Sequence, residues 1–341
     1  MKKRVFITGV AGFLGSHLAK RYLDLGCVVH GVDNFCSSKM NSVHLKALKQ
    51  HGAFMVRHYD VCNAQDPQAL DVFPGMTGII SDGLDNDGGY DIILNFACPA
   101  SPPIYQKIPI QTMLTCTLGM YHVLEGAKQS YTNPIVIHAS TSEIYGDPEI
   151  SPQSEAYLGR VHSWGPRACY DEGKRAAEAL CYDYRNLHNV DVRLIRIFNT
   201  YGPQMDPDDG RVVTNFVKQA LKNTDITVYG NGDQTRSFCY VDDLVSGIMK
   251  LASLSKDKSP DHPINLGNPS EFTILELARK VLEMIPESRS KIDFVALPPH
   301  DPTQRKPDIS QAKKFLKGWE PKISLEEGLS RLIPYMKDHV R

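Results

Sequence analysis

The sequence has little of what several large protein classes require. Its 341 residues contain no apolar run long enough to span a bilayer, and the formal net charge is only −1. Such a chain offers no electrostatic case for binding nucleic acid or an anionic membrane surface. The basic N-terminus leads into a strand pattern rather than into a signal peptide, so we expect a cytoplasmic protein with no membrane partner.

The eight cysteines lack the spacing of a metal site or a disulfide framework. No two of them form a Cys-x-x-Cys pair, and no cluster of histidines accompanies them. We therefore interpret them as reduced thiols, and we predict neither a zinc site nor disulfide bonds.

The N-terminal segment carries the pattern of a dinucleotide-binding turn. An apolar run from Arg4 to Thr8 is typical of a buried parallel strand. It leads directly into Gly9-Val10-Ala11-Gly12-Phe13-Leu14-Gly15 and a predicted helix over residues 16–25. Glycines at such a turn let the backbone approach a pyrophosphate at the N-terminus of the helix. The Gly-x-x-Gly-x-x-Gly spacing departs by one residue from the usual fingerprint.

A second predicted strand, over residues 28–32, ends at Asp33. An acid at this place can accept hydrogen bonds from an adenosine ribose and would repel a 2′-phosphate. The order of strand, glycines, helix, strand and acid therefore predicts a site for NAD rather than NADP. A glycine turn beside a solvent-facing Asp33 would explain the same residues without a cofactor.

Strand and helix patterns alternate through the first two-thirds of the chain. Further strands are predicted over residues 54–58, 90–96, 135–139 and 190–197. This alternation predicts an α/β fold, a doubly wound parallel sheet of Rossmann type over residues 1–200, with ligands at the carboxyl ends of its strands. A stretch rich in Gly and Asp between Phe73 and Tyr90 is interpreted as a surface-loop insertion, since it lacks the closing glutamate of a calcium loop.

The character of the sequence changes from about Gly202. Loops rich in Pro and Gly alternate there with predicted helices over residues 212–222, 244–254, 273–284 and 325–337. We assign residues 201–341 mainly to a smaller C-terminal α/β substrate lobe, with the chain crossing between the lobes. Two predicted loops in this part, at 228–236 and 301–308, end in or carry arginines that suit a phosphate or a carboxylate.

Tyr170 and Lys174 are four residues apart on a predicted helix, so their side chains lie on one face. A phenol with a pKa of about 10 is a poor base at neutral pH. An adjacent ammonium is expected to lower that pKa, which would let Tyr170 exchange a proton with a sugar hydroxyl. A Tyr-x-x-x-Lys pair alone is most often a pair of surface neighbours, and its weight here comes from the dinucleotide pattern that precedes it.

Several longer segments form recognisable patterns. They are Ala97-Cys98-Pro99-Ala100-Ser101-Pro102-Pro103, Ser140-Thr141-Ser142-Glu143, Gly165-Pro166-Arg167-Ala168-Cys169-Tyr170 and Arg305-Lys306-Pro307-Asp308. On these segments the chain resembles the extended short-chain dehydrogenase/reductase superfamily and, within it, the UDP-glucuronate decarboxylases (UDP-xylose synthases). The glycine turn and the Tyr/Lys pair mark only the superfamily, whereas the Ser-Pro-Pro stretch, the Thr-Ser-Glu triplet and Arg-Lys-Pro-Asp are far narrower markers.

The resemblance implies a role for individual residues. Tyr170 would be the catalytic base and Lys174 its activator, Thr141 would bond the 4-OH of the sugar, Glu143 would lie beside the reacting carbons, and Arg305 would face the sugar carboxylate. The residues that align with NAD contacts are Gly9, Gly12, Phe13, Leu14, Gly15, Asp33, Asn34, Phe35, Asp60, Val61, Cys98, Thr115, Tyr170, Lys174, Thr200 and Arg211. The residues that align with substrate contacts are Tyr105, Thr141, Asn199, Arg236 and Arg305, with Asn199 and Arg236 at the UDP diphosphate.

The reaction implied by the resemblance is decarboxylation of UDP-glucuronate to UDP-xylose through a 4-keto sugar, with NAD bound throughout turnover. A UDP-sugar 4-epimerase shares the same Tyr/Lys and NAD apparatus, and a non-catalytic NAD-binding module on the same fold is a further alternative. Glu143 favours the decarboxylase, because epimerases of this superfamily usually carry a small or neutral residue at that position.

Two segments depart from the family pattern. Leu114-Thr115-Cys116 stands where the family usually has Lys-Thr-Asn, and His162-Ser163-Trp164 replaces a run of smaller residues. Both changes leave the identity of the sugar acid open. The superfamily also implies a homodimer built on a four-helix bundle, although packing inside one chain would explain many of the same apolar positions. Those positions are Met113, Leu118, Tyr121, Leu124, Ala177, Leu180, Cys181 and Tyr184.

Overall fold

The computed structural model describes residues 2–40, 42–63, 89–296 and 304–340. The insertion predicted between Phe73 and Tyr90 lies almost wholly outside the described residues, as does the start of the predicted loop at 301–308.

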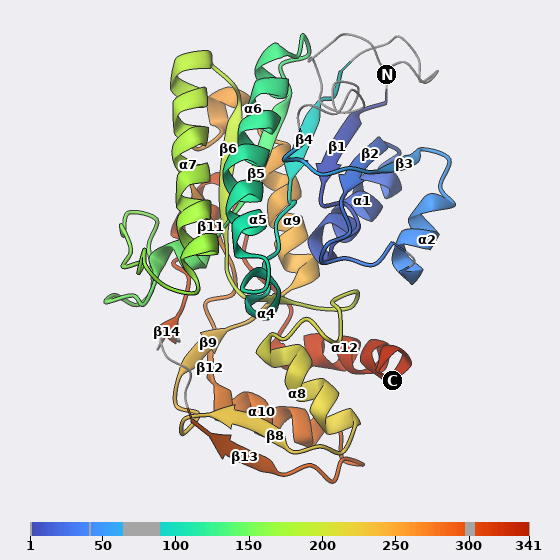
Figure 1. The fold of residues 1–341 in the computed structure, drawn as a ribbon, viewed down its shortest axis with the longest axis vertical. Helices are drawn as coiled ribbons and strands as arrows, with labels where there is room; N and C mark the ends of the chain where they lie inside the picture. Colours follow the sequence, from blue (N-terminus) through green and yellow to red (C-terminus); the bar gives the residue numbers. More distant parts are fainter. Residues whose placement is uncertain (1, 41, 64–88, 297–303, 341) are drawn as a thin grey trace.

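A seven-stranded sheet forms the centre of the larger layer (Figure 1). All neighbouring strands in it are parallel, and their order is β11-β6-β5-β4-β1-β2-β3. The order reverses beside β1, which is the place where doubly wound sheets bind their ligands. The prediction of a doubly wound parallel sheet is confirmed. The strands are β1 (Arg4–Thr8), β2 (Val28–Asp33), β3 (Phe54–His58), β4 (Ile92–Asn95), β5 (Ile135–Thr141), β6 (Val192–Ile197) and β11 (Ile264–Leu266).

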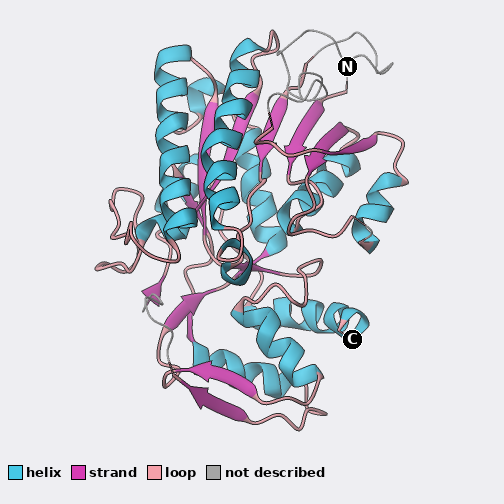
Figure 2. Ribbon diagram, viewed as in Figure 1, coloured by secondary structure: helices cyan, strands magenta, loops and turns pink. Residues whose placement is uncertain are grey.

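Helices cover both faces of this sheet (Figure 2), and the sequence of β4 explains how. Successive side chains of a strand point to opposite faces. Ile92 and Leu94 pack in the cluster that holds α1 (Phe13–Asp24), α2 (Val43–Lys49) and α9 (Val241–Ala252), whereas Ile93 packs in the cluster of α6 (Met120–Gln129) and α7 (Ala168–His188). A strand buried on both faces needs this continuous apolar run, which is why β4 reads as Ile-Ile-Leu.

A long helical segment precedes β5 and lies along α7 (Figure 1). It comprises α5 (Pro109–Leu114), a π-helical turn η1 (Thr115–Gly119) and α6. Short helical turns complete the larger layer, namely α4 (Pro102–Tyr105), η2 (Ser142–Tyr145) and η3 (Lys256–Lys258). Single π-helical turns inside α-helices occur frequently at functional sites.

The second half of the chain builds a smaller layer below the carboxyl ends of the sheet strands (Figure 1). Its α8 and α10 pack on the parallel pair β8–β13. The division of the chain at residue 200 stays a prediction, since β11 and α9, from beyond it, belong to the larger layer. The remaining elements are β7 (Thr200–Tyr201), α8 (Val212–Leu221), β8 (Ile226–Tyr229), β9 (Thr235–Ser237), β10 (Cys239–Tyr240), β12 (Glu271–Thr273), α10 (Ile274–Met284), β13 (Ile292–Val295), β14 (Gln304–Arg305), α11 (Ser310–Phe315) and α12 (Leu325–His339).

The two arginine-bearing loops predicted in this half differ from the structure. Thr235–Ser237 is a strand that pairs antiparallel with β12 and parallel with β14, so Arg236 and Arg305 are neighbours in register. The composition of each segment gives no hint of this pairing because the partner strands lie far away in the sequence. The small β12-β9-β14 sheet therefore carries both arginines to one place.

None of the helices within the described part of the chain is long and apolar enough to cross a bilayer.

Candidate active site

A cavity of about 1070 Å³ lies at the carboxyl ends of the parallel strands and is lined from both layers. It brings together every residue predicted for catalysis and for substrate binding. From the predicted cofactor set it is lined by Gly9, Gly12, Phe13, Leu14, Gly15, Cys98, Tyr170, Lys174, Thr200 and Arg211. The other six predicted cofactor residues do not line the cavity, and their places are given below.

The glycine turn at one end of the cavity depends on two of its glycines. Gly9 has φ +70°, a left-handed conformation, and a Cβ there would lie 2.8 Å from the backbone nitrogen of Ala97. A Cβ at Gly15 would lie 2.1 Å from the carbonyl oxygen of Gly9. Among the described residues, no side chain caps the N-terminus of α1, so its first N–H groups can bind an anion. This arrangement fits the pyrophosphate of a dinucleotide.

Asp33, at the end of β2, is held beside the glycine turn by three hydrogen bonds. Its carboxylate accepts from the backbone N–H groups of Ala11 (3.0 Å) and Phe35 (2.8 Å) and from the Ser38 hydroxyl (2.8 Å). These contacts fix the acid beside the turn. The residues of the turn and of β2 together fit NAD, and a contact of Asp33 with the adenosine ribose stays a prediction.

A second group of predicted cofactor residues stands behind the cavity wall. Asp60 accepts from the Asn34 amide (3.0 Å), the Cys62 backbone N–H (2.9 Å) and the Gln111 amide (3.2 Å). The Thr115 hydroxyl donates to the carbonyl of Gln111 at 2.8 Å. Val61 packs against Gly119 of the π-helical turn. The structure thus ties these residues to one another and sets them beside the cavity rather than on its surface.

Tyr170 and Lys174 face the cavity from α7 and are both nearly fully buried. The Lys174 ammonium donates to the carbonyl of Ala139 at 2.7 Å and lies 5.8 Å from the centre of the Tyr170 ring. Burial raises the pKa of Tyr170 well above its usual value, and a hydrogen bond with Thr141 offsets this only in part. The net lowering of the Tyr170 pKa that was predicted from Lys174 is therefore not found, because burial disfavours the phenolate more strongly.

Tyr105, at the end of α4, stacks on Tyr170. The two rings are 5.0 Å apart and nearly parallel, at 3°. The Tyr105 hydroxyl is buried, lies in the cavity lining and has no hydrogen-bond partner among the described residues. Because a buried hydroxyl without a partner costs about 1–3 kcal/mol, this group fits a ligand contact.

Glu143 lies at the centre of a charged cluster in the lining of the same cavity. Its Oε2 accepts a hydrogen bond from Arg305 Nη2 at 3.1 Å and another from Arg167 Nη2. Arg305, only 1% exposed, also donates from Nη1 to the carbonyl of Ser142 at 2.5 Å. Although burial opposes its charge, the guanidiniums of Arg305 and Arg167 hold the pKa of Glu143 at about 2. Two cations on one carboxylate leave a net positive charge that suits a second carboxylate, that of a sugar acid.

Arg167 contacts Glu143 and lines the cavity, and no role was predicted for it from the sequence. A signal was present, because Arg167 is the N-cap residue of α7 and lies three residues before Tyr170, so the two side chains lie on nearly the same face. The segment that contains it matches the family, but the resemblance gave a role only to its tyrosine and lysine.

The residues predicted for the diphosphate and the remaining cofactor contacts come from the connection between the layers. Asn199 and Thr200 lie directly after β6, where the backbone carbonyl of Asn199 accepts from the Cys239 N–H at 2.8 Å. Arg211 makes a bidentate ion pair with Asp209, at 2.5 and 2.9 Å. Their roles toward NAD and UDP stay predictions.

Asp171 follows Tyr170 on α7, and its buried carboxyl group has few hydrogen-bond partners. It is 6% exposed, its Oδ1 has no hydrogen-bond partner among the described residues, and its Oδ2 lies 3.8 Å from Arg167 Nε. Burial, assisted by the negative charge of Glu143, raises the pKa of Asp171 to about 7. An ion pair at this distance is too loose to reverse the effect of burial.

The Asp171→Asn variant should be stabilised relative to the parent protein as the pH rises. A folded-state pKa of about 7, above the unfolded value of about 3.9, means that Asp171 costs stability once the pH passes from the lower value through the higher one. Asparagine mimics the neutral acid, so the gain should be on the order of 1–3 kcal/mol at about pH 8 and smaller at about pH 5. Calorimetric melting temperatures of both proteins at the two pH values measure it. Asp183→Asn, exposed on the same helix, is the control, and an equal gain there would contradict the interpretation.

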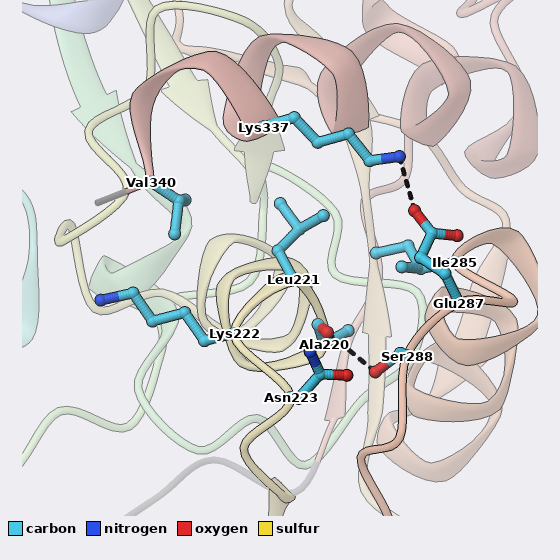
Figure 3. A pocket seen from close by; sticks show the side chains of 9 residues that line it. All are labelled: Ala220, Leu221, Lys222, Asn223, Ile285, Glu287, Ser288, Lys337 and Val340. Carbon is cyan, nitrogen blue, oxygen red and sulfur yellow. Dashed lines mark hydrogen bonds and ion pairs between the residues drawn. The ribbon is translucent and has the colours of Figure 1, made fainter.

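A second cavity of about 220 Å³ lies in the smaller layer and shares Lys222 and Val340 with the lining of the larger one (Figure 3). It is lined from α8, the end of α10 and α12. Lys337, one of the two lysines in its lining, is paired with Glu287 at 2.6 Å, and the Ser288 hydroxyl donates to the carbonyl of Ala220. These groups are paired within the chain, and we assign no site to this cavity.

Comparisons with known proteins agree with this geometry. A sequence model described as GDP-mannose 4,6 dehydratase matches residues 6–332. UDP-glucuronic acid decarboxylase 1 of Xenopus tropicalis is 44% identical over 98% of this chain and 72% of its own length. UDP-glucuronic acid decarboxylase 6 of Arabidopsis thaliana is 44% identical over 99% of this chain and 89% of its own length.

Among solved structures, the UDP-glucuronic acid 4-epimerase of Bacillus cereus, in complex with UDP-glucuronic acid and NAD, superimposes with a TM-score of 0.81. It is 24% identical, and the match covers 98% of this chain and 99% of that one, which establishes the shared fold. The sequence relatives go further, and on their identity over nearly the whole length this chain belongs to the GDP-mannose 4,6-dehydratase family of extended short-chain dehydrogenases and, within it, to the UDP-glucuronic acid decarboxylases.

Proposed function

We propose that the protein is a UDP-glucuronate decarboxylase that forms UDP-xylose with NAD as a bound prosthetic group. The observation that carries this assignment is the cluster of Arg167, Arg305 and Glu143 in the same cavity as Tyr170. Decarboxylation at C5 requires a proton acceptor for the 4-OH and cations for the C6 carboxylate. The cavity offers both, since it holds Tyr170 and a pair of guanidiniums. The 44% identical relatives carry the same activity in their names.

The residues divide the chemistry between them. Bound NAD supplies the acceptor, and later the donor, of the C4 hydride. Tyr170 takes the proton of the 4-OH as C4 becomes a ketone, with the Thr141 hydroxyl beside the same oxygen. The C6 carboxylate is then β to a carbonyl, so loss of CO₂ leaves an enolate rather than a bare carbanion. Thr141 and Tyr170 stabilise the developing oxyanion, and Arg305 and Arg167 orient the departing carboxylate.

Product analysis tests the assignment directly. The purified protein, incubated with UDP-glucuronate, should release CO₂ and a UDP-pentose, both measurable by mass spectrometry. UDP-galacturonate formed without CO₂ would instead identify a 4-epimerase, and an accumulating 4-keto pentose would identify a relative that releases its intermediate.

We also propose that the enzyme is a homodimer, paired through the face formed by α5, α6 and α7. Of the apolar positions on these helices and on η1, Leu124, Ala177 and Cys181 are buried within the chain, while Leu118 and Tyr121 are 37% and 43% exposed. Ile110 and Leu114, on α5, extend this exposed strip. Apolar side chains at helical spacing on an uncovered face support pairing with a second copy.

Light scattering at micromolar concentration is expected to give twice the chain mass of 38.1 kDa. Tyr121→Glu and Leu118→Glu, which place charges in the proposed interface, should shift the mass toward the monomer. The matched change Leu25→Glu, at a residue 68% exposed at the end of α1, should leave the mass unchanged. A monomeric parent protein would remove the proposal.

We place the enzyme in the cytoplasm. The support is chemical, since all eight cysteines are free thiols and a reducing compartment keeps them so.

A further inference from the structure

Two thiols that take no chemical step in the proposed reaction meet beside the catalytic helix. The Sγ atoms of Cys98 and Cys116 are 3.3 Å apart, although the residues are 18 positions apart in the sequence. Cys98 follows β4 and lines the cavity, whereas Cys116 lies in the π-helical turn η1 and is 2% exposed. Cys116 is also one of the residues at which this chain departs from the pattern of the family it resembles.

Cys116 is held tightly from the side of α7. A Cβ at Gly173 would lie 3.0 Å from Cys116 Cβ and 3.3 Å from its Sγ, so the helix backbone packs directly against this thiol. Gly173 immediately precedes Lys174 in the same helix. The dithiol is therefore part of the wall that supports Tyr170 and Lys174.

The environment favours reaction between the two sulfurs. The hydrogen bond from the Cys98 thiol, with the nearby Lys174 ammonium, lowers the pKa of Cys116 and so favours its thiolate. A disulfide bond is about 2.0 Å long, so the sulfurs need to approach by only about 1.3 Å. Because Cys116 packs tightly against α7, we expect Cys98 and its loop to make most of that movement.

We propose that Cys98 and Cys116 are a redox modification site, which a peroxide closes to a disulfide and which thereby switches the enzyme off reversibly. One thiolate of the pair attacks a peroxide oxygen and expels hydroxide, which leaves a sulfenic acid. The second thiol displaces water from that sulfur as the S–S bond forms. In sum, two thiols lose two electrons and two protons, and hydrogen peroxide becomes two molecules of water.

The loop of Cys98 explains why closure would reach the active site. The backbone N–H groups of Phe96 and Ala97 both donate to the Thr8 hydroxyl at 3.1 Å, and Ala97 lies against Gly9 of the glycine turn. A shift of Cys98 toward η1 moves this loop relative to the turn and to Tyr170. A displacement of about 1 Å in such a site costs on the order of 100-fold in rate.

The experiment has a readout that does not depend on activity. The protein is treated with hydrogen peroxide, the remaining thiols are alkylated, and its peptides are mapped by mass spectrometry. One cross-linked pair joining the Cys98 and Cys116 peptides is expected, lighter by two hydrogens and reversed by dithiothreitol. Irreversible sulfinic acid at either residue, or no cross-link while other cysteines oxidise, would overturn the proposed site.

The effect of oxidation on turnover rests on the proposed function and is measured separately. Decarboxylation by the parent protein should fall about 100-fold on oxidation and return with dithiothreitol. Cys116→Ser should keep its activity at the same peroxide dose, and Cys116→Ala serves if the serine variant does not fold. Cys36→Ser, at an exposed thiol, should behave as the parent does. A cross-linked protein that is fully active would overturn the proposed switch. Absence of decarboxylation before any oxidation would overturn the proposed function instead, and the cross-link would still be measurable.

Discussion

Replacing Tyr170 by phenylalanine should lower the rate of CO₂ release by roughly 10²- to 10⁴-fold, the usual contribution of a general base. Phenylalanine keeps the ring that stacks on Tyr105 at 5.0 Å and removes only the hydroxyl that faces the cavity. The proton of the 4-OH then has no acceptor when C4 is oxidised, so the first step itself should fail. Little reduced NAD should form on mixing the variant with UDP-glucuronate.

Stopped-flow absorbance of reduced NAD, followed by measurement of CO₂, separates this step from decarboxylation. The matched control is Tyr182→Phe, which removes a hydroxyl from a 65% exposed tyrosine on the same helix and should leave both steps unchanged. If the Tyr170 variant oxidised the substrate at the parent rate, another group would have to be the base. Unchanged melting temperature would exclude loss of the fold as the reason for a low rate.

The local patterns of the first 200 residues were enough to predict six of the seven strands of the sheet, whereas β11, from beyond them, was not predicted. Continuous apolar runs such as Ile92-Ile93-Leu94 predict strands that are buried on both faces. Gly9 and Gly15 predict a tight turn, and the structure leaves no room for a larger residue at either position. Such features depend on a residue and its chain neighbours, so they are visible without the fold. Helix boundaries were less accurate, since α1 begins at Phe13 rather than Ser16 because residues of the glycine turn already adopt helical backbone.

Structural features that depend on residues far apart in the sequence could not be predicted from local patterns. The sequence predicts loops at β9 and β14, because each strand is only two or three residues long and exists through pairing with distant strands. Arg305 was expected to face a substrate carboxylate, and its pairing with Glu143, across 162 positions of sequence, follows only from that small sheet. The pKa of Tyr170 is a further case, because the spacing to Lys174 was visible but the degree of burial was not.

Arg305→Lys should slow the loss of CO₂ by roughly 30- to 1,000-fold, which corresponds to about 2–4 kcal/mol of transition-state stabilisation. The guanidinium already spans the Ser142 carbonyl (2.5 Å) and Glu143 (3.1 Å), and a planar fork can present further N–H groups to a sugar carboxylate. An ammonium is a single point of charge, so it cannot hold the same three partners in one plane. The carboxylate would then no longer be fixed with its breaking bond aligned to the ketone. Oxidation at C4 does not need this alignment, so reduced NAD should accumulate while CO₂ release lags.

That split between the two steps distinguishes a role in the reaction from a role in the fold. Arg305 is as buried as Arg193, which bonds Asp191 and the carbonyls of Leu251 and Leu254, far from the proposed chemistry. Arg193→Lys is therefore the matched control, since it should lower the melting temperature and leave the ratio of oxidation to CO₂ release as it is in the parent. If Arg305→Lys behaved in the same way, or released CO₂ at the parent rate, Arg305 would be a structural arginine that positions Glu143. A specific accumulation of reduced NAD in this variant alone would place the Arg305 guanidinium at the carboxylate in the decarboxylation step, because loss of packing slows both steps together.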